Sequence, residues 1–441
     1  MTNQKEPQNG VSTFLVHLHY WGTLPMKRTF LNILSQTKKR VEENTFLNTY
    51  RLKNTYFSRS SGKMRFSEAI YFILKGIKKT LQIELDNWFW NQGRESMTKQ
   101  SFSELRQKIS PKAFVELNDI FVSQFYESSY KKYKGYRLLA IDGSITEIPN
   151  TELNREYFGY YHNQSSWKQS RAMATVIYDV ENDVIVESDI RNWKSAERTV
   201  AMELIERLDK KDIKDNLFLF DRGYPSVEMF NFLAEKHAKY LIRVKNSKFH
   251  KKIDSIKDDD KIITLENCIE KLRVINVTLN TGETEKLITN VYDESFTKND
   301  FKELYFKRWG IETKYCQLKS RYELENFSGC LPIAIEQDFY ANIYLSNMLV
   351  LAKDEANEKI QSEKTNLKYE YKVNMNIFIG KMIPMLVSAI LEENSSKRAE
   401  LYAKVMKSIE RNIVPIRTDR SFPRREPSRK TKYPYTRRRA L

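Results

Sequence analysis

The sequence predicts an α/β protein in which a central sheet with helices has a helical region on either side. Between about residues 136 and 291, apolar strand-like runs alternate with helix-period segments, which is typical of a sheet with a parallel portion. Residues 1–130 and 333–410 mainly show the three- and four-residue apolar spacing of helices. Hydrophobic residues make up 41% of the 441 positions, enough for a large core. Only 13 glycines and 11 prolines exclude a collagen-like or wholly disordered chain.

The N-terminal region is predicted to contain several short helices. Residues 101–108 begin with Ser101 and have Glu104 three positions on, the pattern of a capping box. A second helix is expected after Pro111. Two short helices with basic side chains suit a DNA-reading unit, and a plain helical bundle explains the pattern equally well. One further apolar stripe with helical spacing comprises Phe66, Ile70, Ile73, Leu74 and Ile77.

The central region begins with an apolar run, YRLLAI, and continues with regular alternation. Two strand-like runs enclose a turn at 181–183, which predicts a hairpin. The expected order is therefore strand, hairpin, helix, strand, helix, strand. The predicted segments are a strand at 136–141, a hairpin at 171–190, a helix at 195–208, a strand at 216–220, a helix at 227–237 and a strand at 240–244.

Beyond residue 245 the alternation breaks. Residues 246–284 are rich in Lys and Asp and carry short strand signals, so a β-rich inserted subdomain is predicted there. A core strand resumes at 287–291, and one long helix is expected at 297–322. The predicted division is a helical region at 1–130, a central α/β domain at 131–350 with its insertion at about 246–284, and a helical region with a basic tail at 351–441.

The net charge points to a polyanionic partner. Lys and Arg number 74 and Asp and Glu 57, giving +17, an excess that favours nucleic acid, although plain solubility explains it about as well. Residues 411–441 hold 11 basic and two acidic residues, a net charge of +9, so the other 410 residues share +8. Pro423, Pro427 and Pro434 punctuate this basic tail, so it is predicted to be an irregular segment.

Cysteine usage and hydropathy indicate an intracellular protein without a membrane segment. Three cysteines cannot form a disulfide framework, and they include no Cys-x-x-Cys pair. No run approaches the 18 or so apolar residues of a membrane helix. The first residues, MTNQKEPQNG, lack a signal-peptide layout. A cytoplasmic location is therefore expected.

Two acidic residues stand where ligands gather in α/β sheets. Asp142 follows the apolar run RLLAI, Asp221 follows NLFLF, and each has a glycine within the next two residues. Ligands bind at the carboxyl ends of strands in open α/β sheets, and neighbouring strands lie about 4.8 Å apart. One such acid is usually a turn former. Two on similar strands suit Mg²⁺, which prefers oxygen ligands.

The predicted helix at 297–322 supplies a third element. Tyr305, Arg308, Glu312 and Lys319 lie at offsets 0, 3, 7 and 14, which fall on one narrow face at about 100° per residue. Such a face suits DNA phosphates, with Arg as a bidentate donor, Lys as a point charge and Tyr as a hydroxyl donor. A solvated helix face can gather the same charges by chance.

Two further positions draw attention. Gly310, in the middle of the expected helix, costs about 1 kcal/mol relative to Ala, and close approach of the backbone to the sheet or to DNA would explain it. Arg243, on the strand at 240–244, could reach the backbone of bound DNA. A salt bridge at the rim of the domain is an equally good interpretation of Arg243.

These residues carry a family resemblance. The chain resembles the insertion-sequence-four group of bacterial DDE transposases, and the likeness covers about residues 136–350. The last of the matching segments keeps every spacing of that group's Y-x(2)-R-x(3)-E-x(6)-K signature. The segments are IDGS (141–144), FDRGY (220–224), ITN (288–290) and LYFKRWGIETKYCQLKS (304–320), with looser likeness at 98–117 and in the basic C-terminus.

The resemblance implies a ribonuclease H-like catalytic core with the β-rich insertion. Asp142, Asp221 and Glu312 would then hold two Mg²⁺ ions, with Mn²⁺ as a substitute, about 3.5–4 Å apart across the scissile phosphate. Tyr305, Arg308 and Lys319 would grip phosphates at the transposon end, with Arg243 as a further candidate for DNA contact.

The activity implied is cleavage at transposon ends, through a hairpin, followed by strand transfer into target DNA. The expected partners are the terminal inverted repeats, the target DNA and a second copy of the chain in a synaptic homodimer. The 1–130 region would bind DNA ends, and the protein would associate with the bacterial nucleoid. Two alternatives stay open: a nuclease on the same fold without strand transfer, and an inactive DNA-binding descendant, against which the intact acidic triad argues.

Overall fold

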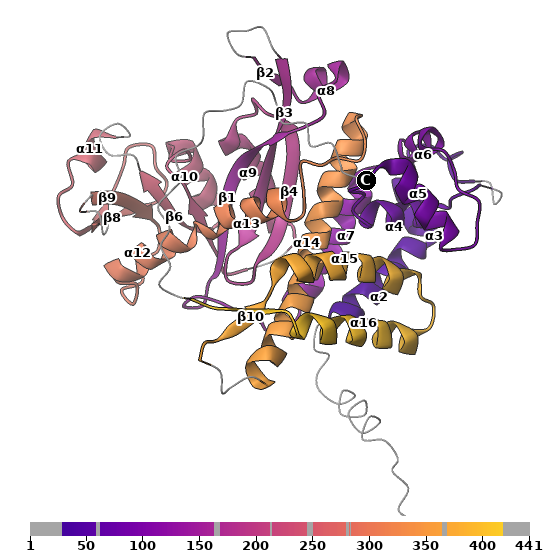
Figure 1. Ribbon diagram of the computed structural model, residues 1–441. Coiled ribbons are helices and arrows are strands. Elements are labelled where there is room, and N and C mark those ends of the chain that lie inside the picture. Colours follow the sequence, from indigo (N-terminus) through magenta and orange to yellow (C-terminus); the bar gives the residue numbers. More distant parts are fainter. Residues whose placement is uncertain are drawn as a thin grey trace, which may run out of the picture.

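The computed structural model describes residues 29–58, 62–162, 168–211, 214–244, 250–278, 282, 284–363 and 368–417. A nine-stranded mixed sheet lies at its centre, with helices on both sides (Figure 1). Most of the predicted basic tail lies outside the described residues. The strands follow the order β2-β3-β1-β5-β6-β9-β8-β7, and β4 pairs with the other edge of β3.

Five strands form the part of the sheet that carries the predicted alternation. β1 pairs antiparallel with β3, which in turn pairs antiparallel with β4. On its other side β1 runs parallel to β5, and β5 runs parallel to β6. Helix α9 leads from β4 into β5, and α10 connects the parallel strands β5 and β6, because parallel neighbours need a crossover connection. The elements are β1 (Arg137–Glu147), β3 (Lys168–Asp179), β4 (Val184–Asn192), α9 (Glu197–Asp209), β5 (Asn216–Phe220), α10 (Val227–Glu235) and β6 (Lys239–Val244).

The predicted order of strand, hairpin, helix, strand, helix and strand is therefore found. The buried apolar runs explain it, since every residue of β5 from Leu217 to Phe220 is buried, as befits a strand covered on both faces. A short arm, β2 (Tyr160–His162), pairs with the start of β3 after helix α8 (Glu152–Tyr157).

The segment predicted as an inserted subdomain continues the central sheet. β9 (Thr284–Thr289) pairs antiparallel with β6, and β8 (Leu272–Thr278) and β7 (Asp260–Ile263) follow outward. A short helix, α11 (Lys251–Asp254), precedes them. Pairing with β9 satisfies the backbone groups of β6, which would otherwise form an open edge. The expected core strand at 287–291 is therefore the last strand of a three-stranded antiparallel extension.

Helices from both ends of the chain pack on each other beside the sheet (Figure 1). The long α14 (Pro332–Glu363) contacts α2, α4 and α7 of the N-terminal region as well as α15 and α16 of the C-terminal region. The others are α2 (Phe30–Glu42), α3 (Asn44–Tyr50), α4 (Phe66–Leu74), α5 (Leu81–Trp90), α6 (Lys99–Arg106), α7 (Lys112–Tyr126), α15 (Met375–Leu391) and α16 (Ser395–Glu410).

Two local predictions differ from the structure. Helix α6 is capped by Thr98, whose Oγ1 accepts from the N–H of Ser101 at 3.2 Å, so the predicted cap residue lies inside the helix. Threonine and serine are both good caps, and the earlier one adds a turn. The start of the predicted irregular tail forms a strand instead: β11 (Ile413–Pro415) pairs with β10 (Tyr371–Val373) in a small two-stranded sheet.

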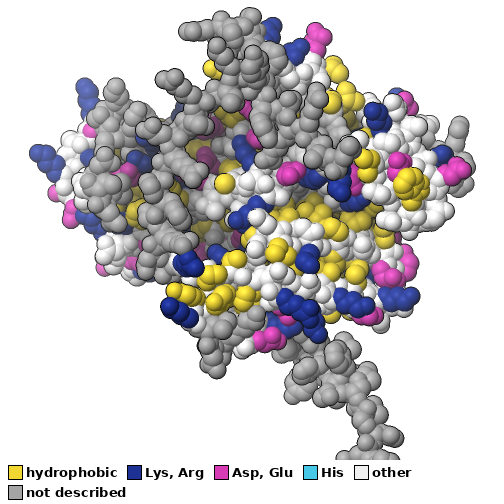
Figure 2. Space-filling model, viewed as in Figure 1, with side chains coloured by type: hydrophobic (Ala, Val, Ile, Leu, Met, Phe, Trp, Pro, Cys, Tyr) yellow, Lys and Arg dark blue, Asp and Glu magenta, His cyan; other side chains and the backbone are white. Residues whose placement is uncertain are grey.

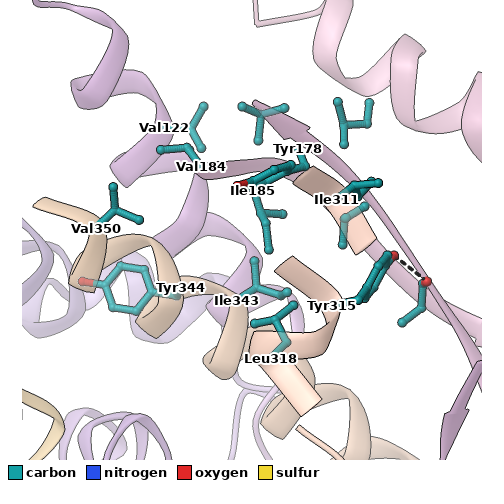
Figure 3. Packing of buried hydrophobic residues seen from close by; sticks show 14 of the residues in the cluster. Val122, Tyr178, Val184, Ile185, Ile311, Tyr315, Leu318, Ile343, Tyr344 and Val350 are labelled. Atoms are coloured by element: carbon teal, nitrogen blue, oxygen red, sulfur yellow. Dashed lines mark hydrogen bonds between the residues drawn. The ribbon is translucent and has the colours of Figure 1, made fainter. Parts of the chain in front are cut away.

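The apolar core is continuous between the sheet and these helices. Figure 3 shows Ile343 and Val350 of α14 on the side of Val184 and Ile185 of β4, whereas Tyr344 points away from β4 and its hydroxyl bonds to Thr37 of α2 at 2.8 Å. In its described part, the chain has no helix that is long and apolar enough to cross a membrane.

Candidate active site

The two predicted aspartates meet at equivalent positions of neighbouring strands. The parallel register of β1 and β5 pairs Ala140 with Leu219, so Asp142 and Asp221 come two residues further on in each and share a face of the sheet. Asp221 directly follows β5. The sequence therefore placed this pair correctly in relation to each other.

The prediction that a strand ends at Asp142 is wrong. β1 continues for five more residues, because Asp142 to Glu147 pair with Val176 to Arg171 of β3. The antiparallel ladder thus runs on past the point where the parallel partner β5 stops. Asp142 therefore lies at the point where β1 loses one of its two neighbours.

The predicted single helix at 297–322 is two helices, α12 (Lys298–Lys307) and α13 (Gly310–Ser320). At the joint the N–H of Trp309 bonds to Phe306 O and that of Ile311 to Arg308 O, both at 3.1 Å, which tightens the turn to three residues. A Cβ on Gly310 would lie 3.5 Å from a ring carbon of Tyr178 in β3, an ordinary contact against the sheet. The four signature residues therefore do not share one straight helix face.

Arg308, at this joint, links two of the acids. Its side chain is buried, and its Nη2 lies 3.1 Å from Glu312 Oε1 and 3.9 Å from Asp221 Oδ1. Glu312 is in the first turn of α13 and is half-exposed. The guanidinium thus places positive charge between carboxylates that come from β5 and from α13.

Tyr305 fixes Asp221 from a second direction. Its buried hydroxyl donates to Asp221 Oδ1 at 3.2 Å and accepts from Arg243 Nη1 at 3.3 Å. Arg243 in turn forms an ion pair with Glu285 of β9. Burial raises the pKa of the Tyr305 hydroxyl, so it remains a donor at neutral pH. Arg243 therefore forms a salt bridge, with Glu285. It is also linked to Asp221, because both residues bond to the hydroxyl of Tyr305.

Lys319, the last residue of the predicted face, lies further along β1. Its Nζ donates to the carbonyl of Ile145 and lies 3.3 Å from Glu325 Oε1. Ile145 is three residues beyond Asp142 on the same strand. Lys319 is partly exposed and does not contact the three acids.

Burial raises the pKa of Asp142 to about 6. Arg308 and the N–H of Gly143, which donates to Asp142 Oδ1 at 3.0 Å, act in the opposite direction, whereas the charges of Glu197 and Asp221 raise the pKa further. Several carboxylates therefore repel one another in a partly desolvated space.

Glu197 belongs to this group, although sequence reasoning did not select it. It begins α9, on a different element from the three predicted acids. Its Oε1 would lie 3.4 Å from a Cβ on Gly143, and its Oε2 4.0 Å from one on Gly223. The glycines after Asp142 and Asp221 were the available signal, but they do not indicate which distant residue approaches them.

Comparison with known proteins identifies the family of the chain. Residues 133–348 match the model of the transposase DDE domain, a span that includes all three predicted acids. The chain is also 22% identical over 321 residues to Transposase InsG for insertion sequence element IS4 of Escherichia coli (strain K12), covering 68% of this chain and 70% of that protein. The chain belongs to the DDE transposases of the insertion-sequence-four family.

A solved structure is similar at a lower level. The cryo-EM structure of a piggyBac transposase synaptic complex with hairpin DNA aligns with a TM-score of 0.44 and 14% identity, covering 92% of this chain and 87% of that chain.

In this transposase a buried charge cluster fastens α13 to the sheet. Asp183, in the β3–β4 turn, accepts from Lys314 of α13 at 3.0 Å, from Lys353 of α14 at 2.5 Å and from the hydroxyl of Tyr178 at 2.9 Å. Figure 3 shows Ile311, Tyr315 and Leu318 on the same helix facing the apolar core. The hydroxyl of Tyr315 bonds to the carbonyl of Asp142 at 2.9 Å, which ties the helix to β1 as well.

The donor atoms of the transposase site fit a hard divalent cation. Asp142, Asp221 and Glu312 offer only carboxylate oxygens, the ligands that Mg²⁺ and Mn²⁺ prefer. Within the described ranges no three His, Cys, Asp or Glu side chains are already arranged as a metal cluster. Arg308 instead supplies the positive charge between Asp221 and Glu312.

Proposed function

We propose that this transposase cuts DNA at the ends of its mobile element and joins those ends to target DNA, in a reaction that depends on divalent metal ions. The observation that carries the proposal is the meeting of Asp142 and Asp221 in register, with Glu312 linked to Asp221 through Arg308. Membership in the DDE transposase family supports it.

The proposed core is ribonuclease H-like. The support is the sheet itself, in which three antiparallel strands in the order β4-β3-β1 continue into two parallel ones, β5 and β6. Asp142 and Asp221 lie on the two strands at the centre of that arrangement. The extension β9-β8-β7 is proposed to be the expected insertion.

Asp142, Asp221 and Glu312 would hold the metal ions. Two such ions, when bound, activate the attacking water or 3′-hydroxyl and stabilise the leaving oxygen. The protein contributes positions and charges, because phosphoryl transfer asks for no covalent step from it. Tyr305 holds Asp221 through its hydroxyl, and the guanidinium of Arg308, beside Asp221 and Glu312, is proposed to donate an N–H to a phosphate oxygen.

The DNA partners proposed are the terminal inverted repeats and the target, with two copies of the chain in a synaptic complex and cleavage through a hairpin. On the face in Figure 2, basic and acidic side chains are interspersed, and basic ones gather along the edge where α16 lies. Lys397, Lys404 and Lys407 of α16 are exposed, next to the start of the basic tail. Lys319 and the basic tail are proposed as further phosphate contacts.

Substitution of the acids tests the function. Asp142→Asn, Asp221→Asn and Glu312→Gln should each abolish Mg²⁺-dependent cleavage of terminal-repeat DNA while DNA binding persists. Asp258→Asn, at an exposed acid on the sheet extension, is the control and should cut normally. A gel that shows joined donor–target products separates a transposase from a nuclease. Near wild-type cutting by any of the three variants would remove that residue from the site.

A further inference from the structure

Glu197 approaches the acidic site from the side opposite to α13. Its carboxylate lies between the backbones of β1 and of the loop after β5, with Oε1 and Oε2 3.4 and 4.0 Å from where Gly143 and Gly223 would carry a Cβ. Gly143 follows Asp142 directly, and Gly223 is two residues after Asp221. Glu197 therefore approaches both aspartate-bearing segments at once.

The two glycines show how closely Glu197 approaches, although neither is required by backbone conformation. Neither Gly143 nor Gly223 has the positive φ that favours glycine, unlike Gly159 and Gly135 elsewhere in the chain. A methyl group at position 143 would contact both the Glu197 carboxylate and, at 3.5 Å, the sulfur of Met173. A side chain at either position would therefore stand in van der Waals contact with Glu197, which places this carboxylate directly against the two aspartate-bearing backbones.

Glu197 also has no partner that would explain its position. Within the described part of the chain it makes no hydrogen bond or ion pair, whereas Asp221 is held by Tyr305 and Glu312 by Arg308. Glu197 as a whole residue is exposed, but partial desolvation of its carboxyl, and then the charge of Asp221, raises the pKa of that carboxyl. A carboxylate that is unpaired and repelled by its neighbour is expected to gain from a cation between them.

We propose that Glu197 is a fourth carboxylate ligand of the metal site, an inference that rests on the proposed metal-dependent function. The charges agree with this role. The three signature carboxylates together with the Arg308 guanidinium carry a net charge of −2, which would face two divalent ions. The carboxylate of Glu197 makes this net charge −3. Mg²⁺ also requires near-octahedral oxygen coordination, so a fourth carboxylate reduces the number of ligands that water must supply.

Binding of Mn²⁺ to the full-length protein without DNA, followed by calorimetry and by water-proton relaxation, tests the proposal. Glu197→Gln should weaken Mn²⁺ binding by about tenfold or more, in line with the loss of groups that support metal sites. Glu206→Gln, at an exposed position of the same helix, is the matched control and should bind like the wild type. In metal-free buffer Glu197→Gln should unfold at the same or a higher temperature than the wild type, since it relieves repulsion.

A second variant and a reference variant make the outcomes distinct. Gly143→Val keeps every carboxylate. Its Cβ would already be in contact with Glu197, so its methyl groups should displace that carboxylate and also weaken Mn²⁺ binding. If Asp221→Asn loses Mn²⁺ while Glu197→Gln and Gly143→Val bind normally, Glu197 is not a ligand and the proposed function stands. If Asp221→Asn and Glu197→Gln both bind Mn²⁺ like the wild type, the metal site itself is wrong.

Discussion

The charge cluster at Asp183 offers a direct test of how the helix that carries Glu312 is held. Asp183 has a φ of 59°, in the left-handed region that asparagine tolerates well. Asp183→Asn therefore removes the negative charge without straining the turn. It leaves Lys314, whose side chain is 2% exposed, and the partly buried Lys353 without a counter-charge.

The expected cost follows from that burial. Removing one partner of a buried ion pair destabilises a protein by about 3–5 kcal/mol. Because the asparagine oxygen still accepts one hydrogen bond, we expect about 3 kcal/mol for Asp183→Asn. Lys314→Met should cost less, about 1–2 kcal/mol, since Lys353 continues to neutralise Asp183.

The sign of the pH dependence is fixed by the same contacts. Burial alone would raise the pKa of Asp183, but Lys314 and Lys353 hold it well below its ordinary value. A lowered pKa contributes stability above the unfolded value of about 4, and this contribution is lost as the pH falls toward the lower folded value. The difference between wild type and Asp183→Asn should therefore be complete at pH 7 and shrink below about pH 4.

Urea unfolding followed by tryptophan fluorescence at pH 7 measures the effect. Asp354→Asn, at a half-exposed acid near Lys353, is the control and should change stability by less than about 0.5 kcal/mol. Lys314 is two residues from Glu312, so Asp183→Asn should also slow cleavage at temperatures where it is folded. If Asp183→Asn is as stable as its control, the cluster does not hold α13 and the reasoning is wrong.

Three further predictions concern the site and the tail. Arg308→Ala should lower transposon-end cleavage by about a hundredfold. Leu304→Ala, at a fully buried position, should mainly cost about 2–5 kcal/mol of stability. Cleavage and thermal unfolding are measured on both variants, and if Arg308→Ala mainly lowers the unfolding temperature, Arg308 forms a structural ion pair. If the tail makes about four phosphate contacts, deleting 411–441 should reduce the slope of log K against log salt by about 3–4 units. Affinity should fall about equally for transposon-end and random DNA. Equal slopes for the full-length and the shortened protein would mean that the tail only keeps the protein soluble. Asp142→Asn should raise the stability of the metal-free protein by about 2 kcal/mol at pH 8, because the raised pKa of Asp142 makes its ionised form costly above pH 6. The gain in stability should disappear near pH 4. Thermal unfolding in the presence of a chelator measures it, and no gain at either pH would mean that Asp142 is well solvated.

The sequence by itself determined which segments are strands and helices in the core, and it placed the two aspartates. A run such as NLFLF, which is apolar from Leu217 to Phe220, forms a strand that is buried on both faces. The three- and four-residue spacing of apolar residues likewise indicates the helices α9 and α10. The acids at the ends of two such runs meet because parallel neighbours bring their carboxyl ends to one edge. This information is local along the chain, so it can be read without the fold.

The tertiary structure alone decided the surroundings of those acids. The joint at Trp309 turned one predicted helix into two, and Tyr305 and Arg308 lie buried against carboxylates instead of forming an open face. Glu197 comes from a helix on the other side of the sheet, 55 residues after Asp142. Such approaches depend on how helices pack against a twisted sheet and on where a neighbouring strand stops. No spacing along the chain encodes that geometry, because it arises from contacts between elements that are remote in sequence.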